Sequence, residues 1–269
     1  MPASIQTRQL TRRFDAVTAV DRLDLEVRAG EVFGLLGPNG AGKTTTIKML
    51  ITLLPPTEGA ASVAGYDIGR EARLVRRSIG YVPQLLSSDG ALTARENLMT
   101  SARLYHLPMA ERQPRIEEAL AFTGLEGAAD RLVRTFSGGM IRRLEIAQAM
   151  LHQPEVLFLD EPTVGLDPIA RRAVWGHIRD LREEEGTTIL LTTHYMDEAA
   201  ELCDRVGIMH LGKLVALGTP AELAAQAGAG RDLDDAFSYF TGAALDEQGD
   251  QGGQYRDVAR TRRTARRLG

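Results

Sequence analysis

Residues 37 to 44 of this sequence are Gly37-Pro38-Asn39-Gly40-Ala41-Gly42-Lys43-Thr44. They match the pattern G-x-x-x-x-G-K-[ST], in which glycines let the backbone turn tightly so that several N–H groups point at one anion. Lys43 adds a compact cation for the β- and γ-phosphates of a nucleotide, and the Thr44 hydroxyl can ligate Mg²⁺. The pattern alone predicts binding of ATP or GTP and does not say what the nucleotide is used for.

The residues on either side of this loop have the character that a phosphate-binding loop requires. Val32–Leu36 is a short apolar run, which predicts a buried strand. Thr45–Leu54 predicts a helix that is stopped by Pro55 and Pro56. The N-terminus of this helix, with its partial positive charge, then faces the phosphate. The alternative is a glycine turn without a nucleotide, and eight matched positions between a strand and a helix argue against it.

The composition bounds the class of protein. The chain has 269 residues, enough for one large domain or two small ones, and 43% of them are hydrophobic. The net charge of −4 argues against a surface that binds nucleic acid generally. Cys203 is the only cysteine, which excludes an internal disulfide and is typical of a small packed side chain. We find neither a secretory segment nor an apolar run of about 20 residues, and so expect a cytosolic protein whose membrane role comes through a partner.

Hydrophobic alternation predicts four further strands, at residues 5–14, 23–28, 62–66 and 79–82. Phe14 ends the first of them, where an aromatic ring can stack on adenine, although an ordinary core phenylalanine is the commoner case. Gln84 follows the last, at a strand end from which its side chain can reach a bound metal or water. Lone glutamines are usually solvated, so this role for Gln84 depends on the motifs around it.

A helical block follows these strands. Ile116, Leu120 and Thr123 share one face of a predicted helix within residues 92–125. No strand is indicated before residue 156, so we expect the block to be inserted between strands of a parallel sheet. Helical insertions in α/β proteins often carry partner contacts, which is a hypothesis for this chain.

A second glycine-containing turn lies at Ser137-Gly138-Gly139. Ser137 is a good N-cap for a helix predicted over residues 140–151. Two glycines beside a serine at a helix start also make a second potential anion site. For this short motif alone, a plain N-cap is the commoner explanation.

Polar residues follow the next two predicted strands. Val156–Leu159 is apolar throughout and leads into Asp160 and Glu161, at the strand end where ligand sites of α/β proteins lie. Asp160 can hold Mg²⁺ through water, and Glu161 can orient or deprotonate a water aimed at the γ-phosphate. The strand Thr188–Thr192 is followed in the same way by His194, a position that favours contact with the γ-phosphate.

The composition changes from Gln226 onward. Leu233–Phe240 predicts one amphipathic helix, residues 246–254 are rich in Gln, Gly and Asp as in a linker, and the last twenty residues are rich in arginine. The arginine-rich end has two explanations. We favour a solvated disordered tail over an electrostatic contact with anionic lipid or with the acidic face of a partner.

Taken together and in this order, the motifs resemble those of the ATPase subunit of an ABC transporter over roughly residues 5–225. The resemblance identifies them as the Walker A motif Gly37–Thr44, the Q-loop residue Gln84, the signature Ser137-Gly138-Gly139, the Walker B aspartate Asp160, the catalytic glutamate Glu161, the D-loop aspartate Asp167 and the switch histidine His194. The residues around the signature and around His194, together with Leu233–Gly242, are similar to the daunorubicin-resistance-type ATPases of two-gene exporters. Two residues depart from the family pattern: Met140 replaces a glutamine, and Phe14 replaces the adenine-stacking tyrosine.

The resemblance implies the fold class and the domains. The fold would be an α/β P-loop NTPase with a parallel-sheet core, an N-terminal antiparallel β part and an inserted helical subdomain at about residues 85–150. Residues 1–225 would form the ATPase domain, and residues 226–269 a C-terminal extension with a short helix and a disordered arginine-rich tail.

It also implies roles for the candidate residues. Glu161, His194 and Gln84 would be catalytic, and Thr44, Gln84 and Asp160 would hold Mg²⁺. ATP would be bound by Phe14, Gly37, Pro38, Asn39, Gly40, Ala41, Gly42, Lys43, Thr44, Thr45, Ser137, Gly138, Gly139 and Asp167.

The partners that it implies are a second copy of the chain and a membrane protein. Two copies would bind head to tail with two ATP molecules between them, and the signature of each would complete the site of the other. A separately encoded permease would dock on the helical block from Gln84 to Leu125. The chain would then lie peripherally on the cytoplasmic side of the cell membrane, without a nucleic-acid partner, and power export of a hydrophobic drug or secondary metabolite.

Three rival functions compete with this one. The first is a small GTPase or nucleotide kinase, but guanine selection usually uses Asn-Lys-x-Asp, which this sequence lacks. A soluble ABC ATPase acting on nucleic acid or ribosomes usually has two ATPase units or a long coiled coil, and only the arginine-rich end supports it. A subunit that exports lipid or polysaccharide has no feature against it in the sequence.

Overall fold

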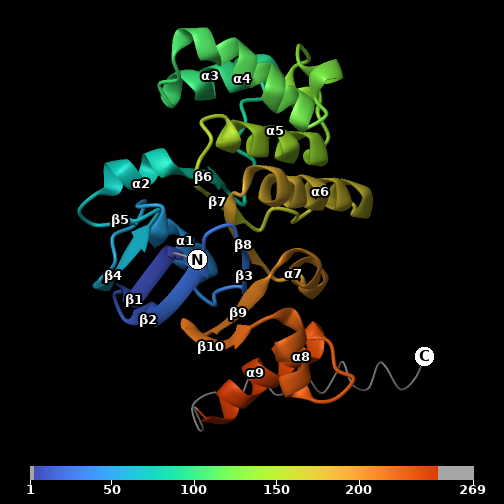
Figure 1. Ribbon diagram of the computed structural model, residues 1–269. Coiled ribbons are helices and arrows are strands. Elements are labelled where there is room, and N and C mark those ends of the chain that lie inside the picture. Colours follow the sequence, from blue (N-terminus) through green and yellow to red (C-terminus); the bar gives the residue numbers. More distant parts are fainter. Residues whose placement is uncertain (1–2, 248–269) are drawn as a thin grey trace.

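A computed structural model describes residues 3–247, and for residues 243–247 it describes the backbone helix alone. The larger of two sheets has six strands in the order β10-β9-β3-β8-β7-β6 (Figure 1). β10 pairs antiparallel with β9, and all the other pairs are parallel. The strands are β3 (Val32–Leu36), β6 (Ile79–Val82), β7 (Val156–Asp160), β8 (Thr188–Thr193), β9 (Arg205–His210) and β10 (Lys213–Gly218). The predicted parallel core is therefore confirmed, with two strands, β9 and β10, that were not predicted.

The second sheet is antiparallel, as expected, in the order β2-β1-β4-β5. Its strands are β1 (Ala3–Phe14), β2 (Val17–Arg28), β4 (Glu58–Val63) and β5 (Tyr66–Asp67). The prediction of one strand over residues 62–66 was wrong. Ala64 and Gly65 have φ values of 51° and 80° and form a two-residue turn, because Val63 pairs with Tyr66 in a hairpin.

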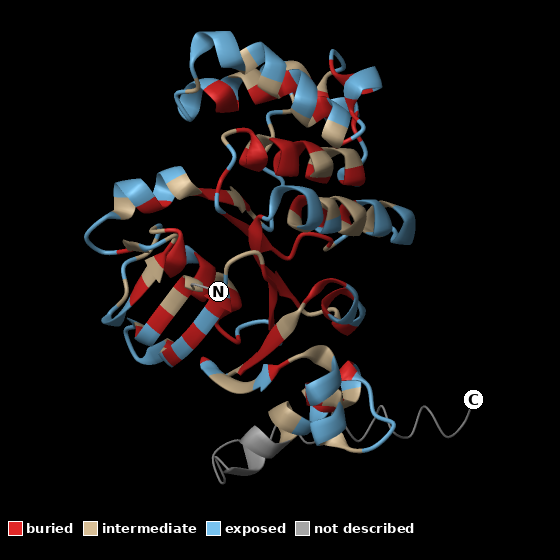
Figure 2. Cartoon of the chain, viewed as in Figure 1, coloured by how far each residue is buried: buried red, intermediate tan, exposed pale blue. Residues whose placement is uncertain are grey.

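The central strands β3, β7 and β8 of the six-stranded sheet are buried on both faces (Figure 2). Successive side chains of a strand point to opposite faces, so Phe33 and Leu35 of β3 pack with the antiparallel sheet and α1 (Lys43–Leu50). Val32 and Leu36 of the same strand pack with helices of the other face, including α6 (Pro168–Glu185) and α7 (Met196–Leu202). Full burial of each large apolar side chain stabilises the fold by roughly 1.5–3 kcal/mol.

The helix after the phosphate-binding loop is shorter than predicted. α1 ends at Leu50 rather than Leu54. Thr52 has φ 64°, and the N–H groups of Leu53 and Leu54 both donate to the Lys48 carbonyl at 2.9 and 3.0 Å. This left-handed turn satisfies the carbonyls at the helix end, so the chain has left the helix before Pro55 is reached.

The predicted helical block is present as a separate layer with a core of its own, at the top of Figure 1. Its helices are α3 (Ala94–Leu104), α4 (Met109–Phe122) and α5 (Gly138–Met150). The predicted face of Ile116 and Leu120 is buried in that core together with Leu144 of α5. α3 begins with a complete capping box, in which Thr93 and Glu96 each bond the other's backbone N–H. A further short helix, α2 (Ala72–Ser78), precedes β6.

The C-terminal part contains α8 (Pro220–Ala227) and α9 (Leu233–Glu247). α9 contains the predicted helix over residues 233–240, and Leu233 and Ala236 are buried against the sheet together with Leu223 of α8. The expected domain boundary after residue 225 therefore falls within α8. Cys203 is buried in the same cluster, as predicted. The linker from residue 248 and the arginine-rich end lie outside the described residues. No helix within residues 3–247 is both long and apolar enough to cross a bilayer.

Candidate active site

The loop of residues 37–42 joins the end of β3 to the start of α1, as predicted. Two of its glycines are required by packing. A Cβ on Gly37 would lie 2.6 Å from the Met209 carbonyl oxygen, and one on Gly42, whose φ is 106°, would lie 2.4 Å from the Ala19 carbonyl oxygen. α1 starts without a side-chain cap or an acidic residue in its first turn. Its first N–H groups are therefore available to an anion in the loop.

Lys43 lies beneath this loop, with 4% of its surface exposed. Its Nζ donates to the Gly37 carbonyl at 2.7 Å and lies 3.4 Å from Oε1 of Glu161. Burial lowers the pKa of Lys43, while the charges of Glu161 and Asp160 act in the opposite direction. The result is a desolvated cation next to the loop amides, which is the arrangement that binds a phosphate strongly.

Asp160 is buried at the end of β7 and accepts two hydrogen bonds on Oδ1. Thr192 of β8 donates at 2.6 Å, and Thr44 of the loop donates at 3.1 Å. Within residues 3–247 no three His, Cys, Asp or Glu residues gather to hold a metal. Mg²⁺ commonly needs only one or two carboxylates together with phosphate oxygens and water, so the adjacent hydroxyl and carboxylate fit this ion.

Glu161, the next residue, is the point on which the other candidates converge. Its φ is 49°, and its N–H donates to both the backbone oxygen and Oγ1 of Thr192. Gln84 Nε2 donates to its Oε2 at 3.2 Å, and Nδ1 of His194 lies 3.3 Å from the same oxygen. The His194 contact is an approach without hydrogen-bond geometry. The unusual backbone angle is held by β8, which fixes where the carboxylate points.

The signature residues lie on the helical layer. Ser137 is the N-cap of α5, as predicted, and accepts from the Met140 N–H at 3.3 Å. A Cβ on Gly139 would lie 2.7 Å from Cβ of Ala170, so α5 packs closely on α6 at this point. Asp167 caps α6 by accepting from the N–H groups of Ile169 and Ala170. Ser137 is exposed, and no hydrogen bond among residues 3–247 joins it to the phosphate-binding loop.

Phe14 ends β1 and is 42% exposed. The Arg12 guanidinium lies 4.5 Å from the ring centroid and covers one side of it. The ring is therefore accessible for stacking, and its contact with adenine stays a prediction.

Two buried acidic residues near the site were not found from the sequence. Glu145 of α5 pairs with the buried Arg142 beside the Q-loop. Glu198 of α7 accepts from Thr163 and Trp175. Charged residues in helices are usually solvated, so neither position gave a signal. The close i, i+3 spacing of Arg142 and Glu145 in a helix with few other charges was the one available hint.

Comparison with known proteins identifies the family. The sequence profile of the ABC transporter family matches residues 20–164. The daunorubicin/doxorubicin resistance ATP-binding protein DrrA of Streptomyces peucetius is 48% identical over 84% of this chain and 68% of that protein. The linearmycin resistance ATP-binding protein LnrL of Bacillus subtilis (strain 168) is 42% identical over 83% of this chain and 72% of that protein.

Solved structures agree with the fold. An ATP-binding subunit of an ABC transporter superposes with a TM-score of 0.78 at 33% identity, over 88% of this chain and 99% of the other. A dimeric structure of MJ0796, a bacterial ABC transporter cassette, has a TM-score of 0.73 at 26% identity, over 80% of this chain and 98% of the other. The chain belongs to the ABC transporter family, as an ATP-binding subunit of the daunorubicin-resistance type.

Proposed function

We propose that this chain hydrolyses ATP as a homodimer and that hydrolysis powers export through a separately encoded permease. The observation that supports this best is the convergence of Lys43, Gln84 and His194 on the Glu161 carboxylate. A carboxylate at the end of a central strand, between a phosphate-binding lysine and two polar side chains, suits a base that activates water.

The roles follow from the contacts. Glu161 orients and deprotonates the attacking water, Gln84 holds its carboxylate by a hydrogen bond, and His194 lies beside that carboxylate to contact the γ-phosphate. Lys43 and the first amides of α1, including that of Thr45, bind the phosphates. Mg²⁺ would neutralise phosphate charge, held by Thr44, Asp160 and Gln84. Phe14 binds the adenine ring of ATP by stacking on it.

Dimerisation is proposed because the signature belongs to no site among residues 3–247 of its own chain. Ser137 and Gly138 are exposed at the start of α5, while Lys43 is buried beneath its loop. A head-to-tail dimer lets Ser137 and the amides of α5 meet the γ-phosphate bound by the other copy. The dimeric structure of the related cassette supports this arrangement.

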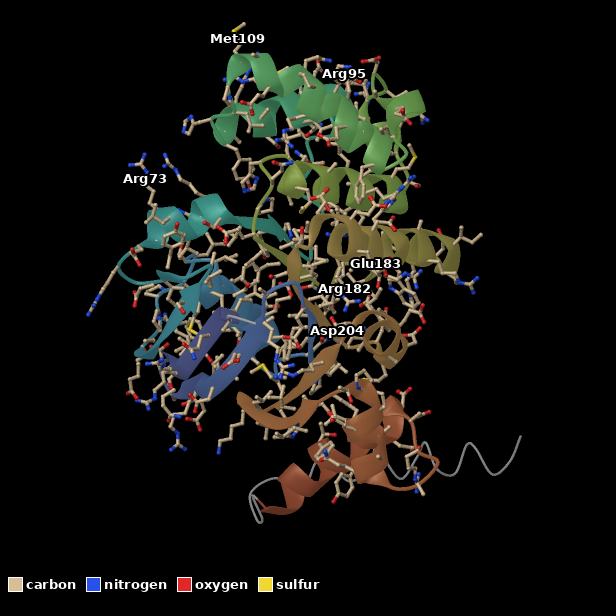
Figure 3. The ribbon with its side chains drawn as sticks, in the orientation of Figure 1. Arg73, Arg95, Met109, Arg182, Glu183 and Asp204 are labelled. Atoms are coloured by element: carbon tan, nitrogen blue, oxygen red, sulfur yellow. The ribbon has the colours of Figure 1, made fainter. Side chains whose placement is uncertain are left out.

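A groove of about 700 Å³ supports a docking site for the permease. It is lined by Leu53 and three arginines of α2 on one side and by the end of α3, which belongs to the predicted docking block, on the other. Arg73, Arg76 and Arg77 form no ion pair with a carboxylate of the described chain, and the Arg73 side chain extends outward from α2 (Figure 3). Leu53 and Leu104 are exposed beside them. This chemistry fits a cytoplasmic segment of the permease with acidic and apolar side chains.

A hydrophobic drug or secondary metabolite is the proposed cargo, because relatives named for daunorubicin/doxorubicin and linearmycin resistance match most of the chain. A relative from Burkholderia thailandensis named for Nod factor export, 46% identical over 82% of this chain and 72% of that protein, is the basis for the alternative of a lipid or polysaccharide cargo. Action on nucleic acid or ribosomes has no support among the described residues beyond the arginines of α2, which face the groove.

The test is co-expression of the chain with its separately encoded permease, followed by drug accumulation and ATPase measurements. We expect ATP turnover and drug efflux with the native chain, and neither with Glu161→Gln. Normal turnover by Glu161→Gln would contradict the role of Glu161, and turnover that is stimulated by RNA and not by the permease would favour the nucleic-acid alternative.

A further inference from the structure

The segment that carries Gln84 is held in place by one stripe of α5. Residues 83–89, between β6 and α3, contain no helix or strand. The backbone groups and serine hydroxyls of residues 83–88 bond instead to three α5 side chains at i, i+3 and i+6 spacing, Arg142, Glu145 and Gln148. Asp89, at the end of the segment, bonds Asn97 of α3. Leu85 and Leu86 of the segment are exposed, so apolar packing does not fix it.

Arg142 makes the contacts nearest to the active site. Its Nη1 donates to the Pro83 carbonyl at 2.7 Å, and its Nη2 donates to the Gln84 carbonyl at 2.9 Å. The same Nη1 donates to Oε2 of Glu145 at 3.0 Å. Glu145 in turn accepts from Oγ of Ser87 at 3.0 Å and from the Ser87 N–H. The planar guanidinium thus grips two successive carbonyls, which the single ammonium of a lysine does not do in the same geometry.

Burying this ion pair costs desolvation free energy, which offsets much of the attraction between the two charges. Arg142 is 1% exposed and Glu145 is 3% exposed, so both charges are desolvated. Burial lowers the pKa of Arg142, although Glu145 and Asp160 oppose the shift. The Nε atom of Arg142 is buried and has no hydrogen-bond partner among the described residues. Apolar residues of similar volume often stabilise a protein as well as a buried ion pair does, so the pair suggests a requirement for geometry.

We propose that Arg142 is a positioning residue that couples Gln84, in the ATP site of its own chain, to Ser137, which serves the ATP site of the other copy. It fixes the backbone of Gln84, whose side chain contacts Glu161, to the same helix whose N-cap is Ser137. Ser137 lies five residues before Arg142, or about 7.5 Å along the helix axis. The inference rests on the proposed function, in which Ser137 serves the γ-phosphate of the other copy. A shift of Gln84 in one site then moves the signature offered to the second site.

The experiment compares purified chains by ATP affinity, kcat and dimer formation. The main variant is the double replacement Arg142→Met with Glu145→Gln, which keeps the volume and leaves no unpaired buried charge. We expect a folded protein that binds ATP with a KM within about threefold of native, whereas kcat falls about 10- to 100-fold because the reacting groups are displaced. The single variant Arg142→Lys keeps the charge but not the planar guanidinium, and its kcat should also fall below that of the native chain. The matched control is Arg95→Met, on the helical layer, where Arg95 bonds Asp130 and Glu117 away from the Q-loop, and its kcat should stay native.

A double-mutant cycle separates positioning from general damage. If Arg142 acts through Gln84, adding Gln84→Ala to the main variant should lower kcat little beyond the larger single loss. The inference would be overturned if the kcat losses of the main variant and of Gln84→Ala multiplied in the combined variant. Native kcat in the main variant or in Arg142→Lys would overturn it as well. A native chain that neither hydrolyses ATP nor dimerises would instead overturn the proposed function, so the two failures are distinguishable.

Discussion

Oγ1 of Thr163 donates a 2.7 Å hydrogen bond to Oε1 of Glu198, and both residues are fully buried. Thr163 follows Glu161 by two residues, and Glu198 lies on α7, which begins just after His194. Trp175 donates to the same oxygen at 3.0 Å, while Oε2 of Glu198 has no partner among the described residues. This bond therefore ties the segment after the proposed base to the segment that carries His194.

Thr163→Val should destabilise the fold by about 1–3 kcal/mol, because it removes a donor from a buried carboxylate without changing the shape of the side chain. Urea unfolding followed by circular dichroism measures this. The control is Thr100→Val on the exposed face of α3, whose hydroxyl bonds only its own helix, and which should change stability little. Equal free energies of unfolding for the two variants would show that the Thr163 hydrogen bond does not stabilise the fold.

Gly139→Ala should lower ATP hydrolysis by separating α5 from α6. The new Cβ would lie 2.7 Å from Cβ of Ala170, so the start of α5 must shift away from the helix that Asp167 caps. The affinity of the monomer for ATP should stay native, because the P-loop lies elsewhere. Gly176→Ala is the matched control: it lies in α6 with nothing within 4 Å of a new Cβ, and should stabilise the helix by about 0.5–1 kcal/mol. Full activity of Gly139→Ala would contradict the importance of this contact.

Reversing the charge of the groove should weaken permease binding. In Arg73→Glu with Arg76→Glu, two of the arginines that line the groove would repel an acidic segment of the permease. Co-purification from membranes should fall, whereas ATP hydrolysis by the isolated chain should not. Arg8→Glu, an exposed arginine of the antiparallel sheet, serves as the control. Undiminished capture of the permease by the groove variant would place docking elsewhere.

ATP binding should take up protons at alkaline pH. Burial lowers the pKa of Lys43 from its ordinary value, so in the free protein this lysine loses its charge at a lower pH than other lysines do. Phosphate favours the charged form and raises the pKa again, so affinity falls with rising pH once the pH passes the lowered pKa. Calorimetry over a series of pH values below the ordinary lysine pKa, in buffers of different ionisation enthalpy, measures the uptake. Proton release, or affinity that rises with pH, would contradict a buried cation that must be charged to bind.

The elements that the sequence predicted well are those whose signal is local. Val32–Leu36, Ile79–Val82 and the strand ending at Asp160 are short apolar runs, and the structure has them with nearly the predicted bounds. The hairpin turn at Ala64 and Gly65 was missed because its signal is the pairing of Val63 with Tyr66. β9 and β10 lie beyond the motifs, and Gly207 interrupts the apolar run of β9.

The candidate site divides in the same way. Lys43, Asp160, Glu161, Gln84 and His194 could be found because each follows or precedes a strand that feeds one sheet edge, and the structure brings them together. Arg142 and Glu198 could not be found, because their importance comes from burial against segments distant in the sequence. The local sequence pattern predicts which residues lie at the ends of strands. It does not predict which charged side chains are buried by segments distant in the sequence.

The central claim, that two copies bind ATP between them with the signature of each completing the other's site, is tested most directly by the mass of Glu161→Gln in solution. Light scattering after size-exclusion chromatography should give 29.3 kDa for the variant alone and twice that mass with MgATP. Adding Lys43→Ala to the variant should keep it at the single-chain mass, because the phosphates are no longer held. A Glu161→Gln chain that binds MgATP and stays at 29.3 kDa, also when its permease is supplied, would contradict the account.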